Sequence, residues 1–178
     1  AAAGYWWEEV LWPDYQRNPA DRYQPICEAA GDDLHSIRMM VAFEIRLMEL
    51  AEQHGVKLAV GSLSYDSPAW DLWVEHYVPL IRRAGQGGHD YNRHAYGGKQ
   101  AADRVLREAR YLRQAGIDTR ILVTEAGLGE GQSFAGIDAF MAQVRLYEDA
   151  FAGEPNVAAF AMWTYPDMAP ASAALAEH

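Results

Sequence analysis

The sequence predicts an α/β fold with a parallel sheet, in one domain that spans residues 1–178. Four short apolar runs are bounded by glycine or proline, a pattern typical of strands that are covered on both faces. Amphipathic helices alternate with these runs, and glycines follow the helix ends. Such alternation implies parallel strands joined by right-handed crossovers. Half of the residues are hydrophobic, which is enough for one well-buried core.

Four strands are predicted from the middle of the chain onward, and a fifth near its beginning. They are Lys57–Ser64, His89–Tyr96, Arg120–Glu125 and Val157–Thr164, with the fifth at Tyr5–Leu11. A doubly wound sheet and a barrel both satisfy this order of strands and helices. No glycine-rich phosphate loop follows a strand, because Gly97-Gly98-Lys99 lacks the Walker spacing. A nucleotide-binding version of the fold is therefore disfavoured.

Four helices are predicted between the strands, each followed by a glycine that can end it. They are Ser36–His54, Ala69–Ala84, Ala101–Ala115 and Ile137–Ala152, and the glycines are Gly55, Gly85, Gly116 and Gly153. Asp32, Asp33 and Ser36 are all candidates for the cap of the first helix, because each side chain can accept a hydrogen bond from an unpaired backbone N–H.

The composition limits the classes of function. Acidic residues number 25 against 15 basic ones, and the net charge of −10 argues against nucleic acid or an anionic membrane as a partner. No stretch has the length of a transmembrane helix and the first four residues lack the features of a signal peptide, so we expect a soluble chain whose compartment is unknown. The single cysteine, Cys27, excludes an internal disulfide. Six tryptophans favour a carbohydrate ligand, since sugar C–H faces stack on flat rings, although tryptophan-rich cores are commoner.

A long polar connection spans Asp14–Asp33 and contains several prolines. It can be a loop that covers the core. It can also face a substrate beyond the carboxyl end of a strand, where the sites of barrels and of open α/β sheets lie. The sequence leaves both roles open.

A carboxylate follows directly on a buried strand in the segment Arg120-Ile-Leu-Val-Thr-Glu125-Ala-Gly127. Burial of an ionised glutamate costs several kcal/mol unless the carboxylate is paired or hydrogen-bonded. The position of Glu125 therefore indicates a catalytic role. A helix cap or a pair with an arginine would also explain it.

This segment resembles the seventh strand of clan A retaining glycoside hydrolases, an apolar run followed by Thr-Glu-x-Gly in which the glutamate is the nucleophile. Three further segments resemble strands of the same family in the same order, so that the resemblance covers roughly residues 57–167. They are Gly61–Pro68 for the fifth strand and its loop, Tyr91–Tyr96 for the sixth, with its His-x-Tyr, and Ala158–Tyr165 for the eighth, with the tryptophan beneath the sugar.

The resemblance implies a (β/α) barrel of TIM type that hydrolyses an oligo- or polysaccharide with retention, with Glu125 as nucleophile and without cofactor or metal. The substrate-binding residues that it implies are His94, Tyr96, Trp163, Tyr165 and Ser64. A buried core position would also explain His94, and packing would explain the aromatic residues at the strand ends.

The general acid departs from the family pattern. A retaining glycosidase needs a second carboxyl group about 5–5.5 Å from the nucleophile, and in this family the acid follows an asparagine on the fourth strand. No Asn-Glu pair occurs in the chain. If Glu8-Glu9 takes that place, Glu9 is the acid and the asparagine is lost. Glu28 is a further candidate.

The barrel is expected to be partial. About five strands with outer helices correspond to strands four to eight, and five strands cannot close an eight-stranded barrel. We therefore expect an uncovered edge, and further chain or a partner subunit that completes the barrel near Tyr5–Leu11.

Two rival hypotheses follow from these departures. One is a catalytically silent carbohydrate-binding barrel that has lost its general acid. The other is an unrelated α/β enzyme in which His89, His94 and Glu125 hold a metal ion, although no HExxH motif supports it.

Overall fold

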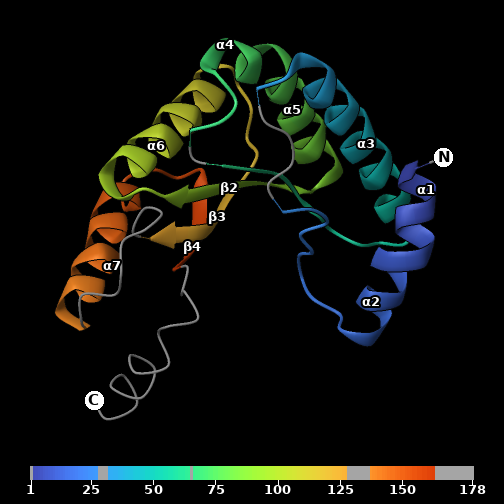
Figure 1. The fold of residues 1–178 in the computed structure, drawn as a ribbon, viewed down its shortest axis with the longest axis horizontal. Helices are drawn as coiled ribbons and strands as arrows, with labels where there is room; N and C mark the ends of the chain where they lie inside the picture. Colours follow the sequence, from blue (N-terminus) through green and yellow to red (C-terminus); the bar gives the residue numbers. More distant parts are fainter. Residues whose placement is uncertain (1, 28–31, 65, 128–136, 163–178) are drawn as a thin grey trace.

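The computed structural model describes residues 2–27, 32–64, 66–127 and 137–162, and its centre is a parallel sheet of four strands in the order β1-β2-β3-β4 (Figure 1). The strands are β1 at Ala59–Leu63, β2 at Asp90–Tyr96, β3 at Ile121–Gly127 and β4 at Val157–Met162. All three neighbouring pairs are parallel. The α/β class and the four later strands are thus confirmed. These strands form an open sheet, and the described residues do not close it into a barrel.

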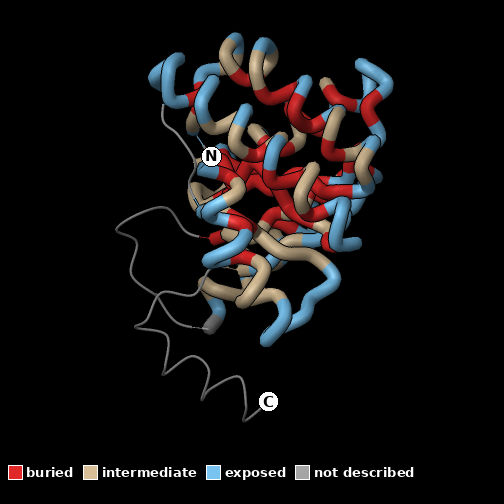
Figure 2. Tube along the Cα trace, turned by 90° about the vertical axis from the view of Figure 1, so that its right-hand side faces the viewer, coloured by how far each residue is buried: buried red, intermediate tan, exposed pale blue. Residues whose placement is uncertain are grey.

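The helix before β1 and the helices that connect the strands form an arc along one side of the sheet (Figure 1). They are α3 at Leu34–Gln53, the continuous run of α4 at Trp70–Leu72, η2 at Trp73–Tyr77 and α5 at Val78–Gly87, then α6 at Gly98–Gln114 and α7 at Ile137–Phe151. Buried residues follow the strands and the inner faces of these helices, and exposed residues lie on the outer turns (Figure 2). None of the described helices is both long and apolar enough to cross a membrane.

The prediction of a strand at Tyr5–Leu11 is wrong, because this segment is helical. It forms α1 at Ala2–Trp6 and the π-helical turn η1 at Trp7–Leu11, and α2 at Trp12–Arg17 continues it. The buried residues are Ala3, Trp7 and Leu11, spaced four apart. That spacing places them on one face of a helix, so the helix covers its apolar side without entering the sheet.

The place beside β1 is taken instead by Tyr23, within the long polar connection. Tyr23 forms an isolated parallel bridge with Leu58: its N–H donates to Lys57 O and its carbonyl accepts from Ala59 N, each at 3.0 Å. The neighbouring Arg22 donates from Nε to Asp90 Oδ2 at 2.5 Å. The connection is therefore fixed against the β1 edge of the sheet.

The helix ends agree with the sequence at most positions. Asp33 is the cap of α3, since its side chain accepts from Ser36 N at 2.8 Å. The predicted stop at Gly85 is wrong: α5 continues to Gly87, and Gly88 ends it in the left-handed conformation with φ +72°. Gly85 is a close-approach position, because a Cβ atom there would collide with Thr119 Oγ1.

The outer strand β4 leaves side chains uncovered. Ala158, Ala159 and Ala161 are exposed, whereas every residue of β1 is buried. Within the described residues, no further strand pairs with β4. Among the described residues, the open edge is therefore at β4, whereas the sequence places the missing part of the barrel near Tyr5–Leu11.

Candidate functional site

A β-bulge in β1 orients side chains at the end of the sheet. The register with β2 shifts between Val60 and Leu63, and the two residues between them, Gly61 and Ser62, have φ angles of +98° and +43°. A non-glycine residue rarely adopts the left-handed region, and such positions cluster near functional sites. The bulge is held by Glu44 of α3, whose Oε1 accepts from Gly61 N at 2.8 Å.

Glu44 is a buried carboxyl group behind this bulge. Its side chain is fully buried, and desolvation raises its pKa from 4.5 to about 7, although the bond from Gly61 N opposes this shift. Burial favours the neutral acid, because the charged form loses its hydration. Glu44 therefore stabilises the bulge from the side of α3.

Three polar side chains extend a row of hydrogen bonds across the sheet. Asn92 Nδ2 donates to Ser62 Oγ at 2.9 Å, and Thr124 Oγ1 donates to Asn92 Oδ1 at 2.9 Å. The row links β1, β2 and β3 and satisfies the buried amide of Asn92. It fixes one face of the strands just before their carboxyl ends.

A second set of polar residues lies one step further along the strands. Tyr96 Oη donates to Ser64 Oγ at 3.1 Å, and the rings of His94 and Tyr96 lie 6.2 Å apart. His94 is fully buried, whereas Ser64 and Tyr96 are half-buried. Alternation along β2 places His94 and Tyr96 on the same face as Asn92.

Glu125 joins this set from β3. It pairs in register with His94, and its Oε2 lies 3.4 Å from His94 Nδ1. The thiol of Cys27 contacts the other carboxylate oxygen, with Sγ 3.4 Å from Oε1. The Glu125 side chain remains 13% exposed.

The structure therefore brings four of the predicted site residues to the same end of the sheet. They are Ser64, His94, Tyr96 and Glu125. Glu9 lies on η1 and is exposed, so it does not stand at a strand end, where the family resemblance would place the acid. Trp163 and Tyr165, with Glu28, fall outside the described residues.

Cys27 is the residue of the site that the sequence did not single out. It lies in the Asp14–Asp33 connection, for which the sequence left a substrate-facing role open. Because Tyr23 pairs with Leu58 of the β1 edge, the connection runs along the sheet towards Glu125. Proximity of the two residues depends on this pairing, which has no local sequence signal.

His89 does not belong to this set. It precedes β2, at the opposite end of the strand from Tyr96. Its Nδ1 accepts from Leu58 N at 2.9 Å, and its Nε2 lies 3.3 Å from Glu52 Oε1. Burial lowers the pKa of His89, while Glu52 opposes the shift. The proposed metal set of His89, His94 and Glu125 is therefore wrong in its first member.

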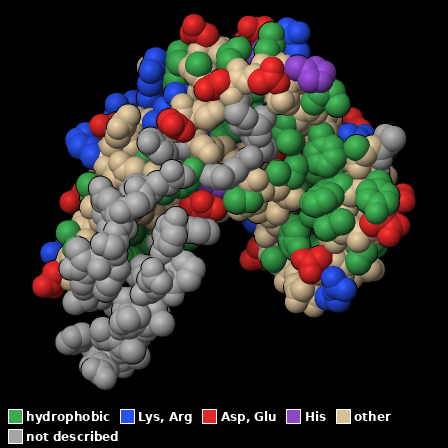
Figure 3. Space-filling view, viewed as in Figure 1, with side chains coloured by type: hydrophobic (Ala, Val, Ile, Leu, Met, Phe, Trp, Pro, Cys, Tyr) green, Lys and Arg blue, Asp and Glu red, His purple; other side chains and the backbone are tan. Residues whose placement is uncertain are grey.

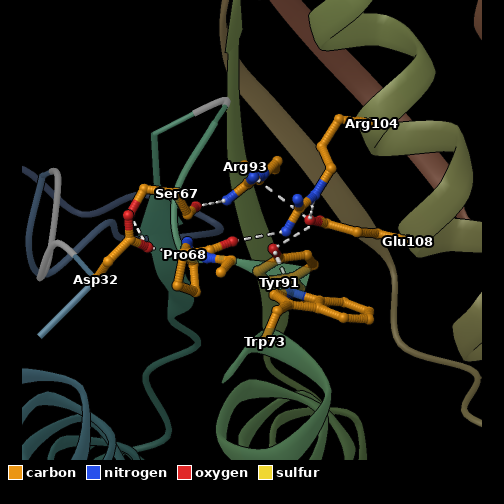
Figure 4. Close-up of polar contacts among 9 residues, drawn as sticks. Asp32, Ser67, Pro68, Trp73, Tyr91, Arg93, Arg104 and Glu108 are labelled. Atoms are coloured by element: carbon orange, nitrogen blue, oxygen red, sulfur yellow. Dashed lines mark hydrogen bonds and ion pairs between the residues drawn. The ribbon is translucent and has the colours of Figure 1, made fainter. Parts of the chain in front are cut away.

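Buried ion pairs fix the loop that follows β1 (Figure 4). Arg93 Nη1 donates to Ser67 O at 2.6 Å, and Arg104 Nη2 donates to Pro68 O at 2.9 Å. Glu108 holds both arginines, with Oε1 3.4 Å from Arg93 Nη2 and 2.6 Å from Arg104 Nε. Arg93 and Glu108 are fully buried, so their charges depend on each other.

The same loop is tied to the connection that carries Cys27. Asp32 Oδ1 accepts from Ala69 N at 2.9 Å and from Ser67 Oγ at 3.4 Å (Figure 4). On the inner side, Tyr91 Oη donates to Glu108 Oε2 at 2.9 Å. These contacts hold the two loops around the site relative to the sheet.

An apolar hollow of about 430 Å³ adjoins the site. Its lining residues are Trp6, Pro25, Ile26, Cys27, Met40 and Phe43. Figure 3 shows hydrophobic side chains gathered over the N-terminal helices, where Tyr5, Trp6 and Val10 are exposed. Cys27 is common to the hollow and to the Glu125 contacts.

The end of the sheet thus combines a carboxylate, an imidazole, a thiol and a phenol from Glu125, His94, Cys27 and Tyr96. A carboxylate in such a place can act as nucleophile, as base or as metal ligand. Comparisons of the chain with protein families, with curated proteins and with solved structures found no match.

Proposed function

We propose that the protein is a retaining glycoside hydrolase with Glu125 as its nucleophile. The observation that carries the proposal is the pairing of Glu125 with His94 at the carboxyl end of neighbouring parallel strands, with Nδ1 and Oε2 3.4 Å apart. A partly exposed carboxylate at that end of a strand has the position of a catalytic group in barrels of this type.

The reaction needs two steps. A carboxylate oxygen of Glu125 attacks the anomeric carbon, the glycosidic C–O bond breaks, and the leaving oxygen takes a proton from a general acid. Water then attacks the glycosyl ester and gives up a proton to the same residue, now a base, while Glu125 regains its carboxylate. The configuration at the anomeric carbon is retained because it inverts twice.

Polar residues beside Glu125 suit the hydroxyl groups of a sugar. His94, Tyr96 and Ser64 lie on the same face and offer ring nitrogens and hydroxyls. From the family resemblance, Trp163 and Tyr165 are expected to supply flat rings beneath the sugar. In the adjoining hollow, Trp6 offers an apolar ring to a second sugar of an oligo- or polysaccharide.

The general acid can be identified with variants of the candidate glutamates. Only the sequence supports Glu9 as the acid, since it lies on an exposed helical turn. Glu28 directly follows Cys27, whose thiol contacts Glu125. Loss of the acid slows glycosides with poor leaving groups far more than those with good ones, because a good leaving group needs no proton. Glu9→Ala and Glu28→Ala are compared on both kinds of glycoside, and equal slowing removes a residue from the role.

The sheet is proposed to be part of a barrel of TIM type. Four parallel strands, the bridge at Tyr23 and the outer helices are compatible with one side of such a barrel. Eight strands are needed for closure. Further chain or a partner subunit would complete it and cover the open edge.

One observation favours the alternative of a silent carbohydrate-binding barrel. The segment that was aligned with the acid-bearing strand is helical. A binder without an acid would keep the sugar contacts and lose turnover of ordinary glycosides. An aryl glycoside with a good leaving group separates the two proposals. A nucleophile alone still releases a burst of phenol from it, whereas a pure carbohydrate binder releases none.

The test of the proposal is Glu125→Gln, which keeps the shape of the side chain but cannot attack. We expect turnover to fall by roughly 10⁴-fold or more, while sugar binding by calorimetry stays nearly unchanged. Azide should restore turnover in Glu125→Ala, whose cavity admits an anion, and not in Glu125→Gln. Full activity of Glu125→Gln would end the proposal.

A further inference from the structure

Three side chains at the site present a donor set for a metal ion. A sulfur of Cys27, a ring nitrogen of His94 and a carboxylate oxygen of Glu125 all lie within 4.8 Å of one another. They come from three separate segments, the connection before α3 and the strands β2 and β3. We propose that they form a binding site for a divalent cation of the zinc type.

Two of the donor pairs have the spacing of a tetrahedral site. Bonds of about 2.3 Å to sulfur and about 2.0–2.2 Å to nitrogen and oxygen place neighbouring donors about 3.3–3.8 Å apart. Cys27 Sγ lies 3.4 Å from Glu125 Oε1, and His94 Nδ1 lies 3.4 Å from the other carboxylate oxygen, Oε2. One donor atom from each of the three residues lies within 4.8 Å of the others, so side-chain movements are needed to bring all three to one ion.

The donor types select the ion. A thiolate and an imidazole favour zinc or a similar transition metal, whereas magnesium and calcium prefer oxygen donors only. Three protein ligands leave the fourth tetrahedral position for water or for a ligand. His94 is fully buried, whereas Cys27 is exposed and also lines the apolar hollow.

The consequence concerns the proposed reaction, because Glu125 serves both roles. A bound ion would occupy the carboxylate and prevent its attack on the anomeric carbon. Zinc should therefore inhibit turnover and a chelator should restore it. Cation binding itself does not depend on glycosidase activity, so each of the two proposals can fail without the other.

The test is titration of the full, metal-stripped protein with Co²⁺, a spectroscopic substitute for zinc. The chain has one cysteine, so a thiolate-to-cobalt charge-transfer band can come only from Cys27. We expect this band at one equivalent, together with the intense visible absorption of tetrahedral cobalt, and its displacement by one equivalent of zinc. If the Cys27 thiol only hydrogen-bonds to the Glu125 carboxylate and no metal binds, no charge-transfer band appears. Absence of the band would overturn the proposal.

Variants assign the ligands. Cys27→Ser should remove the charge-transfer band. Glu125→Gln should weaken zinc binding, measured by calorimetry, by more than roughly tenfold, because loss of a residue that only hydrogen-bonds to a metal ligand already lowers metal affinity by that much. His35→Ala changes an exposed histidine on α3 and should leave binding unchanged. Equal zinc affinity in Cys27→Ser, in Glu125→Gln and in the native protein would place the ion elsewhere and overturn the site. Circular dichroism verifies that each variant is folded.

Discussion

The Sγ atom of Cys27 lies 3.4 Å from Oε1 of Glu125, although 98 residues separate them in the sequence. The contact joins the connection before α3 to the end of β3. It exists because Tyr23 pairs with the β1 edge and Arg22 binds Asp90. An exposed thiol thus lies against the carboxylate that is proposed to be the nucleophile.

Alkylation of Cys27 should therefore block Glu125. Iodoacetamide can modify only one thiol in this chain. We expect turnover of an aryl glycoside to fall to background as one equivalent reacts, because the added group fills the space beside the carboxylate. Cys27→Ser is the control and should keep its turnover in the presence of the reagent. Full turnover of the alkylated native protein would show that the thiol and the carboxylate are not neighbours.

Glu44 should make stability depend on pH. Its pKa of about 7 in the folded protein lies above the value of 4.5 for an unburied carboxyl group. The folded state then binds the proton more tightly, so the free energy of unfolding falls as the pH rises through this window. We expect a loss of roughly 2–3 kcal/mol between about pH 5 and about pH 8.

Urea unfolding of the native protein and of Glu44→Gln at both pH values isolates this contribution. Glutamine has no titrating proton, and its carbonyl oxygen can still accept from Gly61 N. The stability difference between the two proteins should change with pH in the stated direction. A constant difference would mean that Glu44 titrates normally in the folded state.

Glu108→Gln should be strongly destabilising. The carboxylate neutralises Arg93, which is fully buried, and it also binds Arg104 and accepts from Tyr91. Removal of one partner of a buried ion pair costs about 3–5 kcal/mol, because the remaining charge stays desolvated. Denaturant unfolding measures the loss. Glu148→Gln changes an exposed glutamate on α7 and should have little effect, so equal stabilities of the two variants would contradict the role of the buried pair.

Gly61→Ala tests the bulge. A Cβ atom at this position would lie 2.7 Å from Tyr91 Cε2, and the φ of +98° disfavours any side chain. We expect a loss of about 2–4 kcal/mol in the free energy of unfolding. Gly153→Ala is the matched control, since nothing lies within 4 Å of its Cβ position, and a change within about 0.5 kcal/mol is expected there. Similar small changes in both variants would show that the bulge tolerates a side chain.

Three of the four later strands could be predicted because each contains a short apolar run between turn residues, a local pattern. His89–Tyr96 is mostly polar, and the glycines on either side of it, Gly88 and Gly97, mark its ends. The helices followed from apolar spacing, and Asp33 was among the candidate caps. The prediction of a strand at Tyr5–Leu11 is wrong because it matches the segment to a strand of the family, whereas Ala3, Trp7 and Leu11 repeat every four residues. A helix satisfies that repeat and a strand does not.

Tertiary contacts set the features that the sequence could not provide. The sequence predicts a helix stop at Gly85, but a glycine is needed there because Thr119 approaches α5. Glu125, His94, Tyr96 and Ser64 could be placed together, because the ends of parallel strands share one edge of the sheet. Cys27 could not, because its position depends on the pairing of a single residue with β1.

The most direct test of the account is to trap the glycosyl group on Glu125. A panel of 2-deoxy-2-fluoro glycosides with dinitrophenyl leaving groups is used, because the fluorine slows hydrolysis of the ester more than its formation when the leaving group is good. Mass spectrometry of the digested protein should find one fluoroglycosyl group on the peptide that contains Glu125, and none in Glu125→Gln. A label on Cys27 or on another residue would contradict Glu125 as the nucleophile. So would the absence of both label and released dinitrophenol with every glycoside that the protein binds.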